Sequence, residues 1–268
     1  MRWKFILGLL TTCAVLMSMS YTMLIPFLPM YLIQDLGVVK ADVDMWSGAI
    51  FAITFLVSGI MAPIWGALAD KKSRKLMALR AGFCLAITYF LGGLVTNPWE
   101  LLGVRFIQGL SAGLWPALLA IISVESPKLK LGFCLGVMQG GMTAGGVLGP
   151  LFGGLLADQF GMRMAFFIAA AALFLITLAL LFFVKEEPRK PDPNAKPVKI
   201  WDFSLCKIPA VKRMLICAGV VQLTILMQQP IMPLYVAELQ GSMERIVLIS
   251  GIVFSVTGIS GVLASPGW

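Results

Sequence analysis

A ten-residue stretch at positions 66–75, Gly-Ala-Leu-Ala-Asp-Lys-Lys-Ser-Arg-Lys, strongly limits how this chain can fold. It holds one acid and four bases, and long apolar runs precede and follow it. Charges at this density are costly inside a lipid bilayer, whereas apolar runs of about 20 residues cross one as helices. We therefore predict that the stretch is a short loop at a membrane surface between two membrane-spanning helices.

The composition is that of an integral membrane protein. Of the 268 residues, 59% are hydrophobic and 13% are charged, whereas a soluble domain carries about a quarter charged residues. The chain has no histidine, and its five cysteines are far apart, without a CxxC pair. Neither a metal cluster nor a nucleophile–base pair nor a phosphate loop is evident, so we expect no enzyme activity, no cofactor and no metal.

The apolar runs predict an all-α protein with eight membrane spans. We place them at residues 5–30, 45–69, 76–95, 100–124, 131–157, 164–184 and 214–237, and from about 246 onward. Residues 1–20 also resemble a signal peptide, an alternative that the repeat described below disfavours. The expected domains are a six-helix N-terminal bundle (1–184), a polar, proline-rich linker (185–213) and an incomplete C-terminal bundle (214–268).

Lysines and arginines are distributed unequally between alternate loops. All but four of the 21 fall in loops on the same side as the N terminus. The exceptions are Lys40, Arg163 and Arg245 on the opposite side, and Arg105 within the fourth span. Because cytoplasmic loops carry the excess of basic residues, we predict a cytoplasmic N terminus and linker. Topology then explains the net charge of +8, and no nucleic-acid partner is expected.

Two sets of residues recur about 200 positions later in the chain. Pro26-x-x-Pro29-Met30-Tyr31 returns as Pro230-x-x-Pro233-Leu234-Tyr235, and Ser47-Gly48, Phe51, Thr54, Pro63 and Trp65 return as Ser250-Gly251, Phe254, Thr257, Pro266 and Trp268. Six spans per repeat are typical of a transporter with two similar halves and a central binding site. Since the second copy stops at the equivalent of Trp65, we expect the chain to be truncated within its eighth helix, short of about four further spans.

The charged loop suggests a contact between helices. Gly66 and Asp70 are four residues apart and therefore share one helical face. A glycine allows close approach of a neighbouring helix, and a carboxylate is stabilised at a helix N terminus. The alternative is a solvated loop that only sets the topology.

Arg105 is the only base that we place inside a span. A charge at mid-bilayer costs about 2.5–3.5 kcal/mol on insertion scales, so its presence suggests a function. One hypothesis is a buried base that lowers the pKa of a nearby acid and helps to couple protons. The alternative is an interfacial arginine whose side chain extends to the membrane surface. No acid lies in the middle of a span, and Asp35, Asp158 and Glu238 all lie near outer ends.

The fifth span carries glycines at every fourth position, which places them in a stripe down one helical face. These are Gly141, Gly145, Gly149 and Gly153, with Pro150 between them. Such a face packs closely, and the proline bends the helix. We expect this helix at the interface between the two halves, with plain close packing as the alternative.

Candidate substrate contacts are uncharged polar and flexible side chains within the spans. The polar candidates are Gln108, Gln139, Gln228 and Gln229, and the adaptable methionines are Met17, Met19, Met23, Met138 and Met142. A cavity of this kind would suit bulky amphipathic compounds. For each single residue, ordinary packing is the alternative.

Three of these motifs are similar to those of the major facilitator superfamily and, within it, of the bacterial drug:proton antiporters. They are Gly66-x-x-x-Asp70-Lys71-x-Ser73-Arg74-Lys75, Arg105-x-x-Gln108-Gly109 and Gly145-x-x-x-Gly149-Pro150-x-x-Gly153-Gly154. The family has glycine where Ser73 stands, so we expect a stiffer turn. The fold that the resemblance implies is of the major facilitator type: a six-helix N-terminal bundle plus the first two helices of a second bundle.

The resemblance also implies roles for these residues. The loop motif would latch the cytoplasmic side closed through Asp70 and a charge network with Arg74, although the family's partner helix belongs to a C-terminal part beyond this chain. Arg105 would help to couple protons, and the fifth helix would favour exchange over leak. The partners implied are a small amphipathic substrate, protons and the lipid bilayer of a bacterial cell membrane, with the oligomeric state left open.

We therefore predict a secondary active transporter that expels drugs or other amphipathic compounds by proton-driven alternating access. One alternative is a sugar or metabolite carrier of the same superfamily. Another is a truncated fragment that does not transport.

Overall fold

Helices make up almost all of the part of the chain that the structure, a computed structural model, describes: residues 2–24, 27–71, 73–185 and 208–240, with 249, 252, 253 and 256. The α-helices are α1 (Arg2–Leu24), α2 (Leu28–Gln34), α3 (Val43–Lys71), α4 (Arg74–Leu94), α5 (Pro98–Leu110), α6 (Leu114–Glu125), α7 (Leu131–Phe160), α8 (Met162–Phe183) and α9 (Pro209–Gln240). Short 3₁₀ turns lie at Lys40–Asp42 and Lys128–Lys130.

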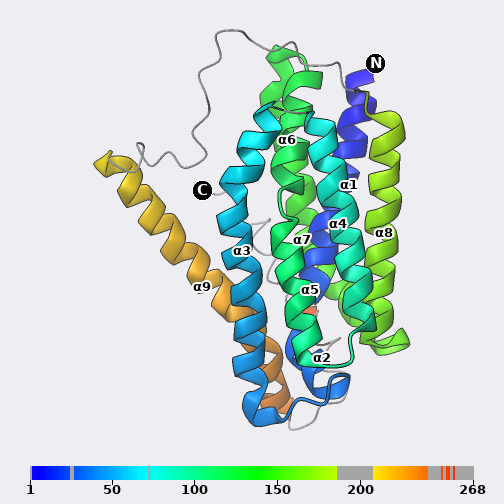
Figure 1. The fold of residues 1–268 in the computed structure, drawn as a ribbon, viewed down its shortest axis with the longest axis vertical. Coiled ribbons are helices and arrows are strands. Elements are labelled where there is room, and N and C mark those ends of the chain that lie inside the picture. Colours follow the sequence, from blue (N-terminus) through cyan, green and yellow to red (C-terminus); the bar gives the residue numbers. More distant parts are fainter. Residues whose placement is uncertain are drawn as a thin grey trace.

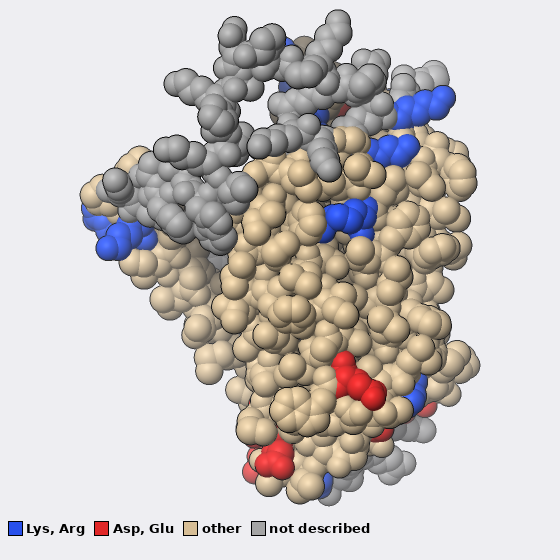
Figure 2. Space-filling view, viewed as in Figure 1, with Lys and Arg blue, Asp and Glu red and all other residues tan. Residues whose placement is uncertain are grey.

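Six segments of the described chain are long and apolar enough to cross a membrane, which confirms the six spans expected for the first bundle. They run side by side, and α9 leans away from them before its far end approaches α2 (Figure 1). Within the bundle, α1 packs along α7, α4 along α8, and α3 against α5. On the face shown in Figure 2, the basic side chains of the described residues gather toward the end that holds the N terminus, and the acidic ones toward the other end.

The buried core has two parts, one near each end of the bundle. The part near the N terminus contains Ile6, Leu10 and Leu118, which have no exposed surface. The part at the opposite end is built around Phe27 and Tyr31, again without exposed surface. Large apolar side chains also cover the outside of the helices, and this apolar exterior is what a bilayer requires of a membrane protein.

The fourth span is not the single helix that we predicted over 100–124. It is broken into α5 and α6 at residues 111–113. Gly113 adopts a φ of +117°, which side chains rarely tolerate. Pro116 lacks the N–H group that would bond the carbonyl of Ala112 in a continuous helix. The glycine and the proline together explain the break.

Other boundaries differ less. The first span, predicted over 5–30, is α1 followed by the short helix α2, which has Pro29 in its first turn. The turn predicted at 96–98 is confirmed, with Asn97 capping α5 by accepting a hydrogen bond from the N–H of Glu100 at 2.9 Å. The loop predicted over 158–163 is reduced to Gly161, whose φ is +83°. The seventh span, predicted over 214–237, lies within α9.

The predicted linker and eighth span fall mainly on residues outside the described part of the chain. Residues 186–207 and most of 241–268 belong to this group. The predicted division of the chain at residues 184 and 213 therefore stays a prediction.

The glycine stripe of α7 packs against the backbone of α1. A Cβ atom added at Gly141 would lie 2.7 Å from Cγ2 of Thr11, and one at Gly149 would lie 2.7 Å from the carbonyl oxygen of Met19. Gly145 faces the carbonyl of Val15, and Gly153 likewise faces the backbone of α1. The stripe therefore packs within the bundle, as the close-packing alternative has it, because its four-residue spacing matches one face of α1. Whether α7 also lies at the interface with a second half stays a prediction.

This packing predicts that Gly145→Ala destabilises the bundle by about 1–3 kcal/mol, because a backbone atom cannot move aside as a side chain can. Gly140→Ala is the matched control, since a Cβ there meets no described atom within 4 Å. Denaturation of the purified proteins in detergent measures both. Equal effects at the two positions would contradict the packing described.

Candidate functional site

A cavity of about 250 Å³ lies inside the bundle, between α1, α3, α4, α5, α6 and α7. Its lining joins flexible and aromatic side chains to short polar ones. The apolar part includes Met17, Phe55, Leu85, Trp115 and Met142, and the polar part comprises Ser18, Tyr21, Thr54, Ser58, Gln108 and Ser111. None of the described residues that line it is charged. Such a lining suits an uncharged or weakly polar surface on a ligand.

Arg105 and Gln108 form a buried pair one turn apart on α5. Arg105 is 7% exposed, and its Nη1 donates a hydrogen bond to Oε1 of Gln108 at 2.9 Å. The arginine therefore does not reach the membrane surface, and the interfacial alternative is wrong. Since Gln108 also lines the cavity, this pair places a positive charge directly behind the cavity wall.

Two tyrosines accompany this pair. Tyr89 on α4 is 2% exposed, and its hydroxyl lies beside Arg105 and Gln108 without a well-formed hydrogen bond to a described residue. Tyr21 on α1 lines the same cavity as Gln108. Arg105 makes no ion pair with a described carboxylate. The acid expected beside it is therefore not found among the described residues.

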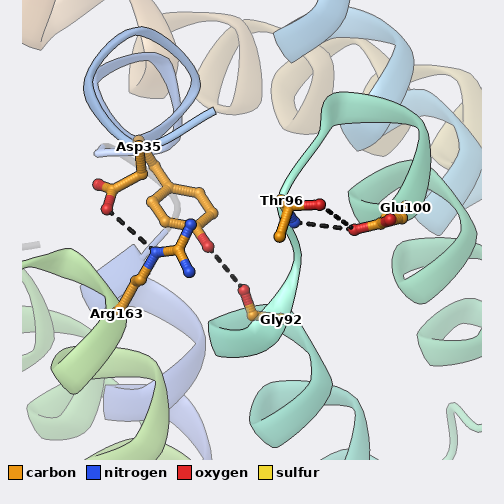
Figure 3. A network of polar contacts seen from close by, with 6 residues as sticks. Asp35, Gly92, Thr96, Glu100 and Arg163 are labelled. Carbon is orange, nitrogen blue, oxygen red and sulfur yellow. Dashed lines mark hydrogen bonds and ion pairs between the residues drawn. The ribbon is translucent and has the colours of Figure 1, made fainter. Parts of the chain in front are cut away.

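The end of the bundle opposite the N terminus holds a separate polar network (Figure 3). Arg163 on α8 pairs with Asp35, with 3.3 Å between Nε and Oδ1. The hydroxyl of Tyr31 donates to the carbonyl of Gly92 at 2.9 Å. Glu100 accepts hydrogen bonds from the N–H and the hydroxyl of Thr96 at 2.8 and 3.1 Å. These contacts tie α2 to α8 and α4, and they engage Asp35 with Arg163 and not with Arg105.

The structure separates the four glutamine candidates. Gln108 lines the cavity, whereas Gln139 is exposed on α7 and does not. The side chains of Gln228 and Gln229 lie outside the described part of the chain. Among the methionines, Met17 and Met142 line the cavity, while Met23 and Met138 are buried in the two core clusters.

The charged loop is shorter than the sequence suggested. Asp70 and Lys71 end α3, and their side chains lie outside the described part. Arg74 and Lys75 belong to the first turn of α4, where the Nζ of Lys75 donates to the carbonyl of Leu181 at 2.7 Å. A Cβ added at Gly66 would meet no described atom within 4 Å, so the close helix contact expected there is not seen.

Ser73 caps α4, which gives a physical reason for a serine at this position. Its Oγ accepts a hydrogen bond from the N–H of Leu76 at 3.0 Å. Serine is among the best N-cap residues, whereas glycine offers no side-chain acceptor.

The sequence analysis missed residues on the helices that flank this loop. We counted Arg80 among the loop bases, but it lies in α4, where its Nη2 donates to the carbonyl of Ala112 at 2.9 Å. Trp65 on α3 donates from its indole N–H to the carbonyl of Leu110 at 2.8 Å. Gly113 and Pro116 in the fourth span were the available signals, since they indicate a break whose carbonyls need other donors.

A comparison with protein families matches residues 10–268 to the model described as Major Facilitator Superfamily. Among curated proteins, the chain is 38% identical over 268 residues to the multidrug resistance protein MdtG of Citrobacter koseri. It is 37% identical over 274 residues to the protein of the same name from Salmonella arizonae. Each alignment covers 99% of this chain and 66% of the relative, so the chain spans slightly less than two thirds of their length.

Solved structures share the fold. A bacterial homologue of the human lysosomal transporter Spinster, in an inward-facing and unoccupied conformation, superimposes with a TM-score of 0.72 at 20% identity, covering 99% of this chain and 63% of that one. The nucleoside transporter NupG gives a TM-score of 0.75 at 18% identity, covering 100% of this chain and 67% of that one. At these identities the likeness concerns the fold alone.

The buried pair predicts that Gln108→Leu destabilises the protein by about 1.5–3 kcal/mol, because it leaves a buried guanidinium without its hydrogen-bond acceptor. Gln139→Leu is the matched control, since that glutamine is exposed. Thermal denaturation in detergent compares the two. If Gln139→Leu lowers the thermal stability as much as Gln108→Leu does, the hydrogen bond between Gln108 and Arg105 does not contribute the stability predicted here.

Proposed function

Since the chain belongs to the Major Facilitator Superfamily, we propose that it serves a secondary active transporter that expels amphipathic compounds, drugs among them, from a bacterial cell. The observation that carries this proposal is the cavity inside the bundle, with Gln108 in its wall and the charge of Arg105 directly behind it. The 37–38% identity to proteins named for multidrug resistance supports the substrate class.

The cavity lining supports compounds that vary in shape. Methionine side chains are flexible and polarisable, and they adapt to different apolar surfaces. Met17 and Met142 lie in the wall with Phe55 and Trp115, while Ser18 and Ser58 offer hydroxyls as either donors or acceptors. A lining without fixed charge selects weakly, which is what a transporter of diverse amphipathic compounds requires.

We assign proton coupling to Arg105 and the residues around it, which are Gln108, Tyr89 and Tyr21. A guanidinium stays protonated at physiological pH, so its charge acts on nearby groups and does not itself titrate. A carboxylate brought close to Arg105 would have a lowered pKa and would release its proton more readily. The movement of one bundle against another could alternately make and break that approach, and so link proton movement to substrate movement.

The charged loop and the glycine stripe of α7 complete the proposal. Residues Gly66, Asp70, Lys71, Arg74 and Lys75 would act as the cytoplasmic latch. The glycine contact between α7 and α1 would keep the bundle rigid while it moves, because closely packed backbones do not slide easily. The accumulation of bases near the N terminus supports a cytoplasmic N terminus (Figure 2).

We expect drug-sensitive bacteria that express the chain to accumulate less ethidium than cells without it. A protonophore should abolish this difference. Arg105→Ala and Asp70→Asn should each raise accumulation toward that of cells without the protein. Asp42→Asn, which alters an exposed acid in the 3₁₀ turn before α3, is the matched control and should behave as the parent. Fluorescence of loaded cells measures all four proteins, with membrane levels checked by immunoblot. If both variants behave as the parent, the proposed mechanism is wrong.

A further inference from the structure

The break in the fourth span leaves backbone carbonyls without the partners of a regular helix, and those of Leu110 and Ala112 are among them. Helix α5 ends at Leu110, so the carbonyl of Leu110 is among those left free at its C terminus. The carbonyl of Ala112 would need the N–H of residue 116, which is Pro116 and has none. Unpaired carbonyls are costly inside a membrane, because no water is there to bond them.

Side chains from two other helices supply the missing donors. The indole N–H of Trp65 donates to the carbonyl of Leu110 at 2.8 Å, and Nη2 of Arg80 donates to the carbonyl of Ala112 at 2.9 Å. The guanidinium of Arg80 also stacks on the indole, with 3.4 Å between Cζ and the ring centroid. Each of the two side chains therefore stabilises the position of the other, and both stabilise the break.

The two donors lie on either side of the charged loop. Trp65 precedes Gly66 near the end of α3, and Arg80 lies in the second turn of α4. The break that they hold forms part of the cavity wall, through Ser111, Ala112 and Gly113. A path of direct contacts thus runs from the helices of the loop to the cavity.

We propose that Arg80 and Trp65 are positioning residues, which hold the break of the fourth span and thereby fix Gln108 and Trp115 in the cavity wall. They also link the position of α3 and α4 at the charged loop to the shape of the cavity. The consequence for ligands rests on the function proposed above, whereas the role in holding the break does not.

A double-mutant cycle tests this role. Arg80→Met removes the donor, and Pro116→Ala restores the backbone N–H that would bond the same carbonyl in a continuous helix. With ethidium as the probe and the purified full chain in detergent, Arg80→Met should weaken binding by about tenfold in the parent, as expected for loss of a hydrogen bond from a charged group. In the Pro116→Ala background, the same change should weaken binding by less than about threefold. An equal loss in both backgrounds would overturn the proposal.

Arg163→Met provides the matched control, because it removes an arginine whose partner is Asp35 at the other end of the bundle. Pro116→Ala should not alter the effect of Arg163→Met, and an equal rescue of both would also overturn the proposal.

Trp65→Phe keeps an aromatic ring but removes the N–H donor. It should weaken binding by a few-fold, as for a neutral hydrogen bond, and remains informative if Arg80→Met does not fold.

The thermal midpoint of the same proteins separates this inference from the proposed function. If the parent does not bind ethidium, the substrate class is wrong, but the midpoints still report on the break. Pro116→Ala should then recover at least half of the midpoint lost through Arg80→Met, and none of that lost through Arg163→Met. No recovery would overturn the proposal whatever the ligand.

Discussion

Every backbone carbonyl inside a bilayer must find its donor within the protein, and this requirement shapes the centre of the bundle. A glycine and a proline interrupt the fourth span, and two of the carbonyls that lose their helical partners accept hydrogen bonds from an indole on α3 and a guanidinium on α4. The break in turn forms part of the cavity wall. A local defect in one helix therefore ties three spans together around the site.

The same requirement distinguishes two arginines near the cavity, Arg80 and Arg105. Arg80 donates to a backbone carbonyl and lies flat on Trp65, so its role is to hold structure. Arg105 donates to the side chain of Gln108, and its charge has no carboxylate partner among the described residues. The positive charge of Arg105 therefore acts electrostatically on any group that enters the cavity or approaches its wall. The glycine contact of α7 with α1 adds rigidity, and it brings Met17 and Met142 to the same cavity from two helices.

Much of the fold could be predicted from hydropathy and charge alone, because the bilayer leaves few alternatives to long apolar helices. The six spans of the bundle follow from this. The turn at Asn97 followed from the residues Thr96-Asn97-Pro98, whereas the burial of Arg105 was only one of two alternatives. The break at Gly113 was not predicted, because an apolar run gives the same signal whether its helix is continuous or broken. The face on which the glycines of α7 pack was also beyond reach, since the spacing reveals a bare stripe but not its neighbour.

The candidate site was predictable only in part. Gln108 could be selected as a polar residue within a span, but Gln139 met the same criterion and lies on the exposed face of α7. Tyr21 and Tyr89 join the site through tertiary packing, for which no local pattern exists. The contacts of Arg80 were missed because a base near a helix end resembles a topological signal until its partner on another helix is known.

Photo-crosslinking would show most directly whether the cavity beside Arg105 binds amphipathic compounds. An azido analogue of ethidium would be bound to the purified chain in lipid nanodiscs, activated with light and located by mass spectrometry. We predict crosslinks at Met17, Trp115 and Met142, which unlabelled ethidium suppresses. Crosslinks confined to outward-facing side chains such as Phe90 and Phe174, with none in the cavity, would contradict the site.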